Sequence, residues 1–421
     1  MKLSIIGTGY VGLVSAVGFA SHGHDIICVD IDTEKIAQIN DGVPPIFEDG
    51  LEELMQKHKA RITATTEYED AITNSDITFI CVGTPSITDG SIDLQYVKET
   101  VKKIGEVLRT KSGWHLVVVK STVIPGTTRD VVLPFLEIAS EKTVGIDIGL
   151  AVNPEFLREG IAVHDFLDPD RIVIGADDEK SSQMLHTLYE TFHSPFMSTS
   201  LSAAEMIKYA SNAFLATKIS FINEIGNLCK RLNIDAYEVA DGVGLDGRIG
   251  RAFLDSGIGW GGSCFPKDLD ALIAWAKHQK ETTSILESVV AVNEAQPLRL
   301  ITLLKKHVPD LQDVTIGVLG LAFKPNTDDI RESRAIPVIN KLLLEGAKVK
   351  VYDPKAMDNF RKLFPGIEYC FSAEDVLAAD AVLITTLWDE FRSLDFSGKI
   401  VIDGRKLDTA HSAEIYEGVC W

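Results

Sequence analysis

Short apolar segments that alternate with longer helix-like segments constrain the fold of this chain more than any other feature. Such a strand–helix–strand rhythm places the strands side by side in a mostly parallel sheet with helices on its faces. The first half of the chain is therefore expected to form a doubly wound α/β domain. The expected strands are 2–7, 25–30, 77–82, 115–121, 149–153 and 171–176.

A second alternation begins near residue 314, after a stretch rich in helix signals. Residues 200–232 form one long helical run without proline, and further helices are expected near 268–279 and 284–307. We therefore expect an α/β protein with two Rossmann-like doubly wound domains joined by a long central helix. The expected later strands are 314–320, 348–353, 381–386 and 399–403, with a helix near 334–345, and the expected domains are 1–198, 199–308 and 309–421.

Composition excludes several classes of function. With 421 residues, 45% hydrophobic and 24% charged, the chain fits a globular protein of more than one domain. Its net charge of −20 would repel nucleic acid and anionic membranes. No apolar run approaches the roughly 20 residues that span a bilayer. The six scattered cysteines indicate neither a disulfide framework nor a zinc site, so we expect a cytoplasmic protein without a metal.

The segment Gly7-Thr8-Gly9-Tyr10-Val11-Gly12 follows the first expected strand and opens the first expected helix. In a G-x-G-x-x-G turn the first glycine allows the tight turn. The second lets a pyrophosphate approach the backbone, and the third lets helix and strand pack. Asp30 ends the next strand, where a carboxylate would bind ribose hydroxyls and repel a 2′-phosphate. Such glycines can serve packing alone, but this context favours a site for NAD rather than NADP.

The second half of the chain lacks this glycine fingerprint. The turn after the expected strand 314–320 carries bulky residues where the last glycine should be, and Lys324 lies in it. One interpretation is a Rossmann-like domain that has lost its ligand. The other is a phosphate site built from side-chain cations, which the presence of Arg331 and Arg405 favours.

Cys264 follows a glycine pair, 261–262, that is expected to be flexible, and precedes a helix expected to start near Asp268. A helix N-terminus and nearby cations lower the pKa of a thiol and favour the nucleophilic thiolate. A cysteine in such a place is more often structural. In a dehydrogenase, however, it can hold an aldehyde as a thiohemiacetal and permit a second hydride transfer, which leaves a thioester for water to open. We therefore interpret Cys264 as the reaction centre.

Other polar residues also stand at positions typical of a catalytic site. Lys208 and Asn212 are four residues apart on the long helix and so share a face. Their neighbours are mostly apolar, so the pair fits a closed site that stabilises an oxyanion; an exposed polar stripe is the other interpretation. Glu155 and Glu159 follow the strand 149–153, at the sheet edge where ligands bind in this architecture.

Together these motifs resemble the UDP-glucose/GDP-mannose dehydrogenase family along the whole chain. The matching segments, in family order, are GTGYVGLVSA, CVGTP, KSTVIPGTT, NPEFLREG, IKYASNAF, GRIG, GGSCFPKD, LAFKPNTDDIRES and IDGR. The resemblance implies an N-terminal NAD-binding domain, a central dimerisation helix and a C-terminal UDP-binding domain. It also implies oxidation of the C6 alcohol of UDP-glucose to a carboxylate, with two NAD and one water.

The resemblance implies roles for individual residues as well. The implied catalytic residues are Cys264 as thiol nucleophile, Lys208 and Asn212 as oxyanion stabilisers, Asp268 and Thr122 acting on water, and Glu155 as the base for thioester hydrolysis. The implied NAD contacts are Gly7, Gly9, Tyr10, Val11, Gly12, Asp30, Lys35, Thr84, Thr122, Glu159 and Arg331. The implied sugar-nucleotide contacts are Glu155, Phe156, Leu157, Arg158, Lys208, Asn212, Phe253, Gly261, Phe323, Lys324 and Arg405. Arg248 would reach the substrate from the neighbouring subunit, which implies a homodimer.

Two residues depart from the family pattern. Trp260 stands where relatives often carry phenylalanine, and Asp255 stands where a basic or amide residue is common. Both lie in the loop expected to follow the sugar, so UDP-N-acetylhexosamine, UDP-N-acetylmannosamine and GDP-mannose stay open as substrates. A one-step hydroxyacid dehydrogenase would not need Cys264, and a non-enzymatic binding scaffold would leave the polar set around it unexplained.

Overall fold

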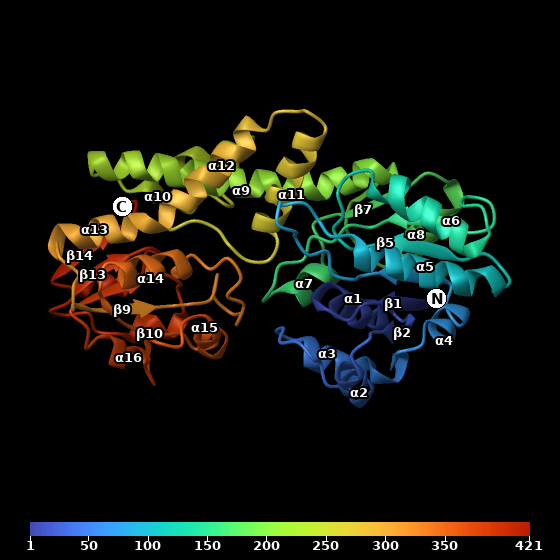
Figure 1. The fold of residues 1–421 in the computed structure, drawn as a ribbon, viewed down its shortest axis with the longest axis horizontal. Coiled ribbons are helices and arrows are strands. Elements are labelled where there is room, and N and C mark those ends of the chain that lie inside the picture. The colour runs from blue at the N-terminus through green and yellow to red at the C-terminus, as the bar shows by residue number, and fades with distance from the viewer. The chain divides into compact units, whose positions relative to one another are not determined.

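The computed structural model describes every residue from Met1 to Trp421. It divides into two compact units, Met1–Ala210 and Ser211–Trp421, each built on one β-sheet covered by helices (Figure 1). None of the helices combines the length and the apolar character that crossing a membrane requires.

Eight strands form the sheet of the first unit: Lys2–Ile6 (β1), Asp25–Val29 (β2), Ile62–Thr65 (β3), Ile77–Ile80 (β4), Leu116–Val119 (β5), Gly149–Val152 (β6), Ile172–Ala176 (β7) and Phe196–Thr199 (β8). Their order is β3-β2-β1-β4-β5-β6-β7-β8, and every neighbouring pair is parallel except β6 with β7. The first six strands have the 3-2-1-4-5-6 order of a Rossmann fold, whose ligands bind beyond the carboxyl ends of the strands.

Helices cover both faces of this sheet: Tyr10–Ser21 (α1), Thr33–Asp41 (α2), Leu51–His58 (α3), Tyr68–Thr73 (α4), Gln95–Thr110 (α5), Leu133–Ser140 (α6), Ala162–Leu167 (α7) and Glu179–Leu188 (α8). Successive side chains of a strand point to opposite faces. In β5, Leu116 and Val118 belong to the core shared with α1, α3, α7 and α8, whereas Val117 and Val119 belong to the core shared with α4, α5 and α6. Burial on both faces explains why these strands are nearly continuous apolar segments.

Six strands form the sheet of the second unit: Thr315–Leu319 (β9), Lys348–Tyr352 (β10), Glu368–Tyr369 (β11), Ala381–Ile384 (β12), Ile400–Asp403 (β13) and Ile415–Gly418 (β14). All neighbouring pairs are parallel, in the order β11-β10-β9-β12-β13-β14. This order repeats the arrangement of the first unit. The predicted fold class, with two Rossmann-like domains and a long central helix, is confirmed.

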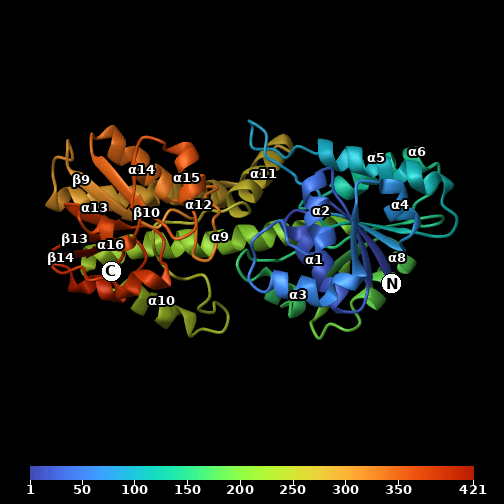
Figure 2. The same cartoon turned by 90° about the horizontal axis from the view of Figure 1, so that it is seen from below.

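The long helix α9 spans Leu201–Leu232 and contains the boundary between the two units (Figure 2). The other helices of the second unit are Ala236–Gly244 (α10), Phe265–His278 (α11), Ser284–Ala295 (α12), Arg299–His307 (α13), Ala335–Leu344 (α14), Met357–Leu363 (α15) and Ala373–Val376 (α16). The single helix expected at 284–307 is interrupted by a 3₁₀ turn at Gln296–Leu298, because Pro297 cannot continue the α-helical hydrogen bonds. The helix expected near Asp268 begins earlier, at Phe265, so Cys264 is its N-cap residue.

Candidate active site

The three glycines of the first turn have three different surroundings. Gly7 has φ +95°, and a Cβ there would lie 2.8 Å from the carbonyl oxygen of Cys81. A Cβ at Gly12 would lie 1.9 Å from the carbonyl oxygen of Gly7, so helix α1 packs directly against the turn. At Gly9, the N-cap of α1, a Cβ would meet nothing within 4 Å. The open space therefore lies over the amide groups of the helix N-terminus, where a pyrophosphate binds.

Asp30 follows β2 and faces this turn. Its Oδ2 accepts hydrogen bonds from the backbone N–H and the hydroxyl of Thr8, at 2.8 and 2.6 Å, and its Oδ1 accepts one from Asp32 N at 3.1 Å. Burial would raise the pKa of this carboxyl, but the hydrogen bonds from Thr8 and Asp32 and the charge of Lys35 hold it below its ordinary value. The carboxylate is therefore ionised and fixed where it can accept bonds from ribose hydroxyls.

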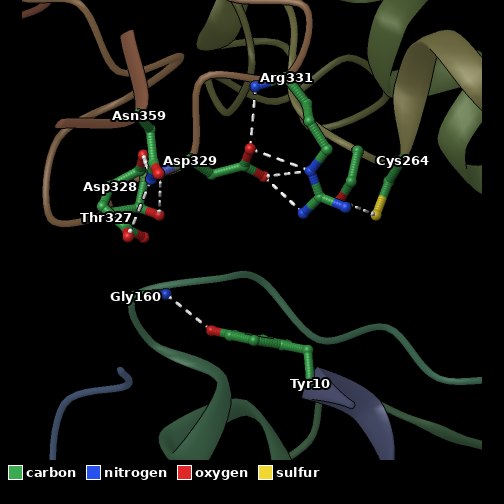
Figure 3. A network of polar contacts seen from close by, with 9 residues as sticks. Tyr10, Gly160, Cys264, Thr327, Asp328, Asp329, Arg331 and Asn359 are labelled. Atoms are coloured by element: carbon green, nitrogen blue, oxygen red, sulfur yellow. Dashed lines mark hydrogen bonds and ion pairs between the residues drawn. The ribbon is translucent and has the colours of Figure 1, made fainter. Parts of the chain in front are cut away.

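Two further contacts hold loops around the same edge of the sheet. The hydroxyl of Thr84, after β4, donates to the carbonyl of Thr122, after β5, at 2.9 Å. Tyr10 bonds through its hydroxyl to the buried carboxylate of Glu48, and Gly160 N donates to the Tyr10 oxygen at 3.0 Å (Figure 3). The loop that carries Glu159 is thus fixed to the first turn of α1.

Glu155 and Lys208 form a buried ion pair. The Lys208 Nζ lies 2.8 Å from Glu155 Oε1, and the two side chains are 5% and 7% exposed. Glu155 Oε2 also accepts the backbone N–H of Leu157 at 2.6 Å. Burial would raise the pKa of Glu155, but the charge and hydrogen bond of Lys208 outweigh it and hold this pKa below its ordinary value.

A second buried lysine, Lys120, directly follows strand β5 and lines the same pocket as Glu155. Its Nζ donates to Asn153 Oδ1 at 3.0 Å, and the Tyr189 hydroxyl donates to the same oxygen at 2.5 Å. Burial lowers the pKa of Lys120 to about 8, while the charge of Glu155 opposes the shift. A pocket of about 100 Å³ in this unit is lined by Lys120 and by four predicted substrate contacts: Glu155, Phe156, Leu157 and Arg158.

Asn212 lies one turn beyond Lys208 along α9 and contacts a different carboxylate. Its Nδ2 donates to Asp268 Oδ2 at 2.7 Å, and Lys267 Nζ lies 2.7 Å from Asp268 Oδ1. Asp268 is only 2% exposed and belongs to the first turn of α11. The two residues predicted from the sequence as an oxyanion pair thus each contact one of the predicted acid–base residues.

Cys264 differs from the other cysteines of the chain. The other five are buried, and burial raises the pKa of Cys28 and Cys81 to about 12. Cys264 is half-buried at the N-cap of α11, where the positive end of the helix favours a thiolate. The hydroxyl of Ser263 lies 3.5 Å from its sulfur.

The glycines before Cys264 are tightly packed, which differs from the flexible pair expected from the sequence. A Cβ at Gly261 would lie 2.0 Å from the carbonyl oxygen of Glu332, and one at Gly262, with φ +86°, would lie 2.7 Å from the Phe323 ring. Gly262 N donates to the carbonyl of Arg331 at 2.9 Å. The Arg331 side chain forms a fork with Asp329, at 2.9 and 2.6 Å (Figure 3). Close backbone approach is therefore the reason for these glycines.

The second unit contains a cavity of about 350 Å³. It is lined by five predicted substrate residues, Phe253, Gly261, Phe323, Lys324 and Arg405, by Asp255 and Trp260, and by Ile219, Gly257, Gly259 and Phe265. Arg405 is fixed in place because its Nε donates to the carbonyl of Thr385 at 2.8 Å. The lining of the cavity thus contains two cations, which suit phosphate groups, and aromatic rings, which suit a base or a sugar.

Phe253 shows backbone strain at this cavity. Its φ is +63°, in the left-handed region that bulky residues rarely adopt. Such strain persists where the surrounding structure fixes the residue, and it often marks a binding site. Arg248 lies outside the cavity of its own chain: its side chain is 89% exposed and pairs with Asp246 at 2.5 Å.

Three sequence models of one family match successive parts of this chain. They describe the NAD-binding domain of the UDP-glucose/GDP-mannose dehydrogenase family at residues 1–193, its central domain at 202–295 and its UDP-binding domain at 317–409. The chain belongs to the UDP-glucose/GDP-mannose dehydrogenase family. As a member it is an oxidoreductase that uses NAD, as predicted from Asp30 and the glycine turn.

Individual relatives of the family resemble the chain along its whole length. A UDP-glucose 6-dehydrogenase of Haloferax volcanii is 50% identical over 431 residues, which cover 100% of both chains. One of Bacillus subtilis is 45% identical over 420 residues, or 96% of this chain and 89% of the relative. The solved structure of a UDP-glucose dehydrogenase from Pyrobaculum islandicum has a TM-score of 0.96 at 44% identity, over 100% of this chain and 98% of that one.

Several residues that build this dehydrogenase site were not found from the sequence. Lys120 gave a signal, because it lies within the apolar segment 115–121 that the sequence predicts as a strand. Glu48 gave none: its partners, Gly160 and Ala162, lie more than a hundred residues away in the chain.

Proposed function

We propose that this enzyme oxidises the C6 alcohol of UDP-glucose to a carboxylate, producing UDP-glucuronate through a covalent adduct on Cys264. In the first oxidation C6 loses a hydride and its hydroxyl loses a proton, which gives an aldehyde. The Cys264 thiolate adds to the aldehyde carbon, and loss of a second hydride converts this thiohemiacetal into a thioester. Water then opens the thioester to the acid and returns the thiol. When bound, NAD supplies the hydride acceptor for both oxidations.

The exposure of Cys264 carries this proposal. Cys264 is half-buried at the N-cap of α11, whereas the other five cysteines are buried. A one-step dehydrogenase has no use for a nucleophile at this place, but a four-electron oxidation needs one to turn the aldehyde into a hydride donor. A binding scaffold would not need an activated thiol either.

The other residues implied as catalytic by the sequence motifs supply the remaining steps. We assign Lys208 and Asn212 to the stabilisation of the oxyanion, since an ammonium and an amide N–H both donate to negative oxygen. Thr122 and Asp268 position the catalytic water, and the buried Asp268 is held for this by Asn212 at 2.7 Å. Glu155, kept ionised by Lys208, takes a proton from the water that opens the thioester.

The cavity of the second unit supports a nucleotide diphosphate as the bound group. Lys324 and Arg405 would hold the diphosphate, because cations beside a cavity suit phosphate oxygens. The sugar then extends toward Phe265, since that residue directly follows Cys264. We assign NAD binding to residues 1–198, dimerisation and catalysis to 199–308, and the UDP-sugar to 309–421.

The stoichiometry of the reaction tests the proposal. The purified enzyme is incubated with excess NAD and a limiting amount of one sugar nucleotide, and the NADH formed per sugar is counted. We expect two NADH from UDP-glucose and a carboxylate product by mass spectrometry. One NADH per sugar would reject the covalent mechanism. A faster reaction with GDP-mannose or a UDP-N-acetylhexosamine would change the substrate that we propose but leave the proposed mechanism unchanged.

We also propose a homodimer in which Arg248 reaches the substrate of the partner subunit. Exposed apolar residues follow one side of α9 at intervals of seven: Phe214, Phe221 and Leu228, at 65%, 53% and 59% exposure. A repeat of seven keeps residues on one face of a helix, and an exposed apolar stripe marks an interaction surface.

Six cysteines without a disulfide fit a reducing compartment, so we place the enzyme in the cytoplasm.

Subunit mixing tests the role of Arg248. An Arg248→Ala protein and a Cys264→Ala protein are each expected to be inactive. If Arg248 acts across the interface, a mixed dimer has one site with both residues intact, so mixing restores part of the activity. Proteins that demonstrably exchange subunits without any rescue would place Arg248 in the site of its own chain.

A further inference from the structure

Buried amide side chains hold the loop from Gly257 to Gly262, which lines the cavity of the second unit. Asn223 Oδ1 accepts the backbone N–H of Gly257 at 2.7 Å, and Gln296 Nε2 donates to the carbonyl of Gly257 at 2.8 Å. Both amides are at most 1% exposed. The first residue of the loop is therefore fixed through both of its backbone polar groups.

Asn293, on α12, holds the middle of this loop in the same way. Its Oδ1 accepts the backbone N–H of Trp260 at 2.7 Å, and its Nδ2 donates to the Trp260 carbonyl at 3.0 Å. Asn293 is 1% exposed. A Cβ at Gly259, with φ +100°, would lie 2.5 Å from Asn293 Oδ1, so only glycine allows this approach. The amide of Asn293 thus makes the two hydrogen bonds to the Trp260 backbone that a neighbouring β-strand would otherwise make.

The indole of Trp260 is fixed as well. Its Nε1 donates to the Ser220 hydroxyl at 3.0 Å, and that hydroxyl donates to the carbonyl of Val289 at 2.9 Å. The indole packs edge-on against Phe265, with ring centroids 6.2 Å apart. Trp260 and Phe265 both line the cavity, whereas Asn293 does not.

We propose that Asn293 is a positioning residue for the sugar of the substrate, acting through Trp260. This inference rests on the proposed function, which places the sugar between the cations Lys324 and Arg405 and the thiol of Cys264. The wall along this path is Trp260. Because its backbone is held by Asn293 and its ring by Ser220, the wall is already in place before the sugar nucleotide binds. Such preorganisation lowers the cost of orienting C6 toward the sulfur.

Replacement of Asn293 by leucine tests the proposal, since leucine has the same number and branching of side-chain heavy atoms and makes neither hydrogen bond. The N–H and C=O of Trp260 then lose their partners, and the loop must move to find others. We expect kcat/KM for UDP-glucose to fall about 10- to 100-fold, the size of effect that a displacement of about 1 Å has on a positioned substrate. The dissociation constant of NAD, measured by calorimetry, should stay unchanged.

Asn293→Asp gives a sharper test, because its effect should depend on pH. A protonated carboxyl has one O–H donor and one C=O acceptor, so it can replace both bonds of the amide. An ionised one accepts from Trp260 N but repels the Trp260 carbonyl. The KM of this variant for UDP-glucose should therefore approach the wild-type value at acidic pH and rise at alkaline pH. The wild-type protein, measured in parallel, should lack this added dependence.

Leu342→Ala serves as the control for stability. Leu342 is fully buried in α14 and does not line the cavity, so its truncation destabilises the same unit without touching the loop. We expect a lower Tm and an unchanged KM for UDP-glucose. If Asn293→Leu folds, binds NAD and keeps the wild-type kcat/KM for UDP-glucose, the proposal is wrong. The proposal is also wrong if the KM of Asn293→Asp for UDP-glucose does not change with pH relative to the wild-type protein. Failure of the wild-type protein to bind UDP-glucose would instead reject the proposed function.

Discussion

Lys208 and Glu155 neutralise each other in the interior of the first unit, with 2.8 Å between Nζ and Oε1. Each charge depends on the other, because a single buried charge is far costlier than a pair. The pairing keeps Glu155 ionised at neutral pH, as a base must be. It also holds the ammonium of Lys208 in one place. A single contact thus prepares both residues for the roles we assign to them.

Glu155→Gln should separate the oxidation steps from the hydrolysis. The glutamine still accepts a bond from Lys208 but cannot take a proton from water, so the thioester should persist on Cys264. We expect turnover to fall about 10²- to 10⁴-fold, the contribution of a general base. Mass spectrometry of the intact protein, after mixing with UDP-glucose and NAD, should find the added mass of the sugar nucleotide.

The double variant Glu155→Gln with Cys264→Ser is the matched control for this trap. Serine is a much weaker nucleophile at neutral pH, so no adduct should accumulate, and Cys264→Ser alone should lose turnover by several orders of magnitude. Two NADH per sugar at a near wild-type rate from Cys264→Ser would make the thiol a bystander.

Asp30→Ala should weaken the binding of NAD and reduce discrimination against NADP. The carboxylate offers charged acceptors to the ribose hydroxyls, and a hydrogen bond to a charged group contributes about 1.5–3 kcal/mol, or roughly tenfold or more in affinity. Calorimetric titration with each cofactor measures both effects. Asp25→Ala is the control, because Asp25 is exposed at the opposite end of β2 and pairs with Arg61. An equal loss in both variants would contradict the assignment.

Lys324→Ala should raise the KM for sugar nucleotide about 10- to 100-fold through the loss of a charged hydrogen bond to the diphosphate. The KM for NAD should change little. Lys350→Ala removes an equal charge from the same unit, where Lys350 pairs with Glu368 at 3.0 Å away from the cavity, and should leave both constants unchanged. Equal changes in the two KM values for Lys324→Ala would mean that the second unit is not the substrate site.

His115 should make the first unit less stable in acid. It is fully buried between Thr78 and Lys111, at 2.7 and 2.9 Å, and burial with the charge of Lys111 lowers its pKa from 6.5 to about 3. As the pH falls below 6.5, the unfolded chain binds the proton first, so stability is lost between pH 6.5 and pH 3. At about pH 5 the loss is about 2 kcal/mol, at about 1.4 kcal/mol for each pH unit.

Urea unfolding of the wild-type protein and of His115→Gln, at about pH 7 and pH 5, measures this contribution. Glutamine does not titrate, so the variant should lose less stability than the wild type over that interval, by about 2 kcal/mol. The other titrating groups are common to both proteins and cancel in the comparison. The same pH dependence in both proteins would contradict a neutral buried His115.

The core of both sheets could be predicted from the sequence, but their edges could not. Strands buried on both faces give apolar segments such as 116–119 that are easily recognised. The four strands that escaped prediction are β3, β8, β11 and β14, and each lies at an edge of its sheet. Their residues are mostly half-buried or exposed, so the apolar signal is weak. The break at Pro297 was visible in the sequence, but the apolar periodicity continued through it.

Parts of the site that depend on local backbone were also predictable. The glycine turn and the cysteine at a helix start are read within a few residues of sequence. The contacts that hold the site come from far away in the chain: Asn293 lies 33 residues from Trp260, and Glu48 lies 112 from Gly160. A single asparagine or glutamate in the sequence does not indicate such a distant partner, because the same residues are common on exposed helices and loops.

The close packing of the four glycines between residues 257 and 262 also limits how the cavity can be redesigned. At each of them an added Cβ would lie within 3 Å of another atom. A mutant library for new sugar nucleotides should therefore leave these four positions unchanged. Diversity belongs at Trp260 and Asp255, whose side chains line the cavity while their neighbours hold the backbone. Because few positions can be changed without moving the backbone, a small library that is screened exhaustively is suitable.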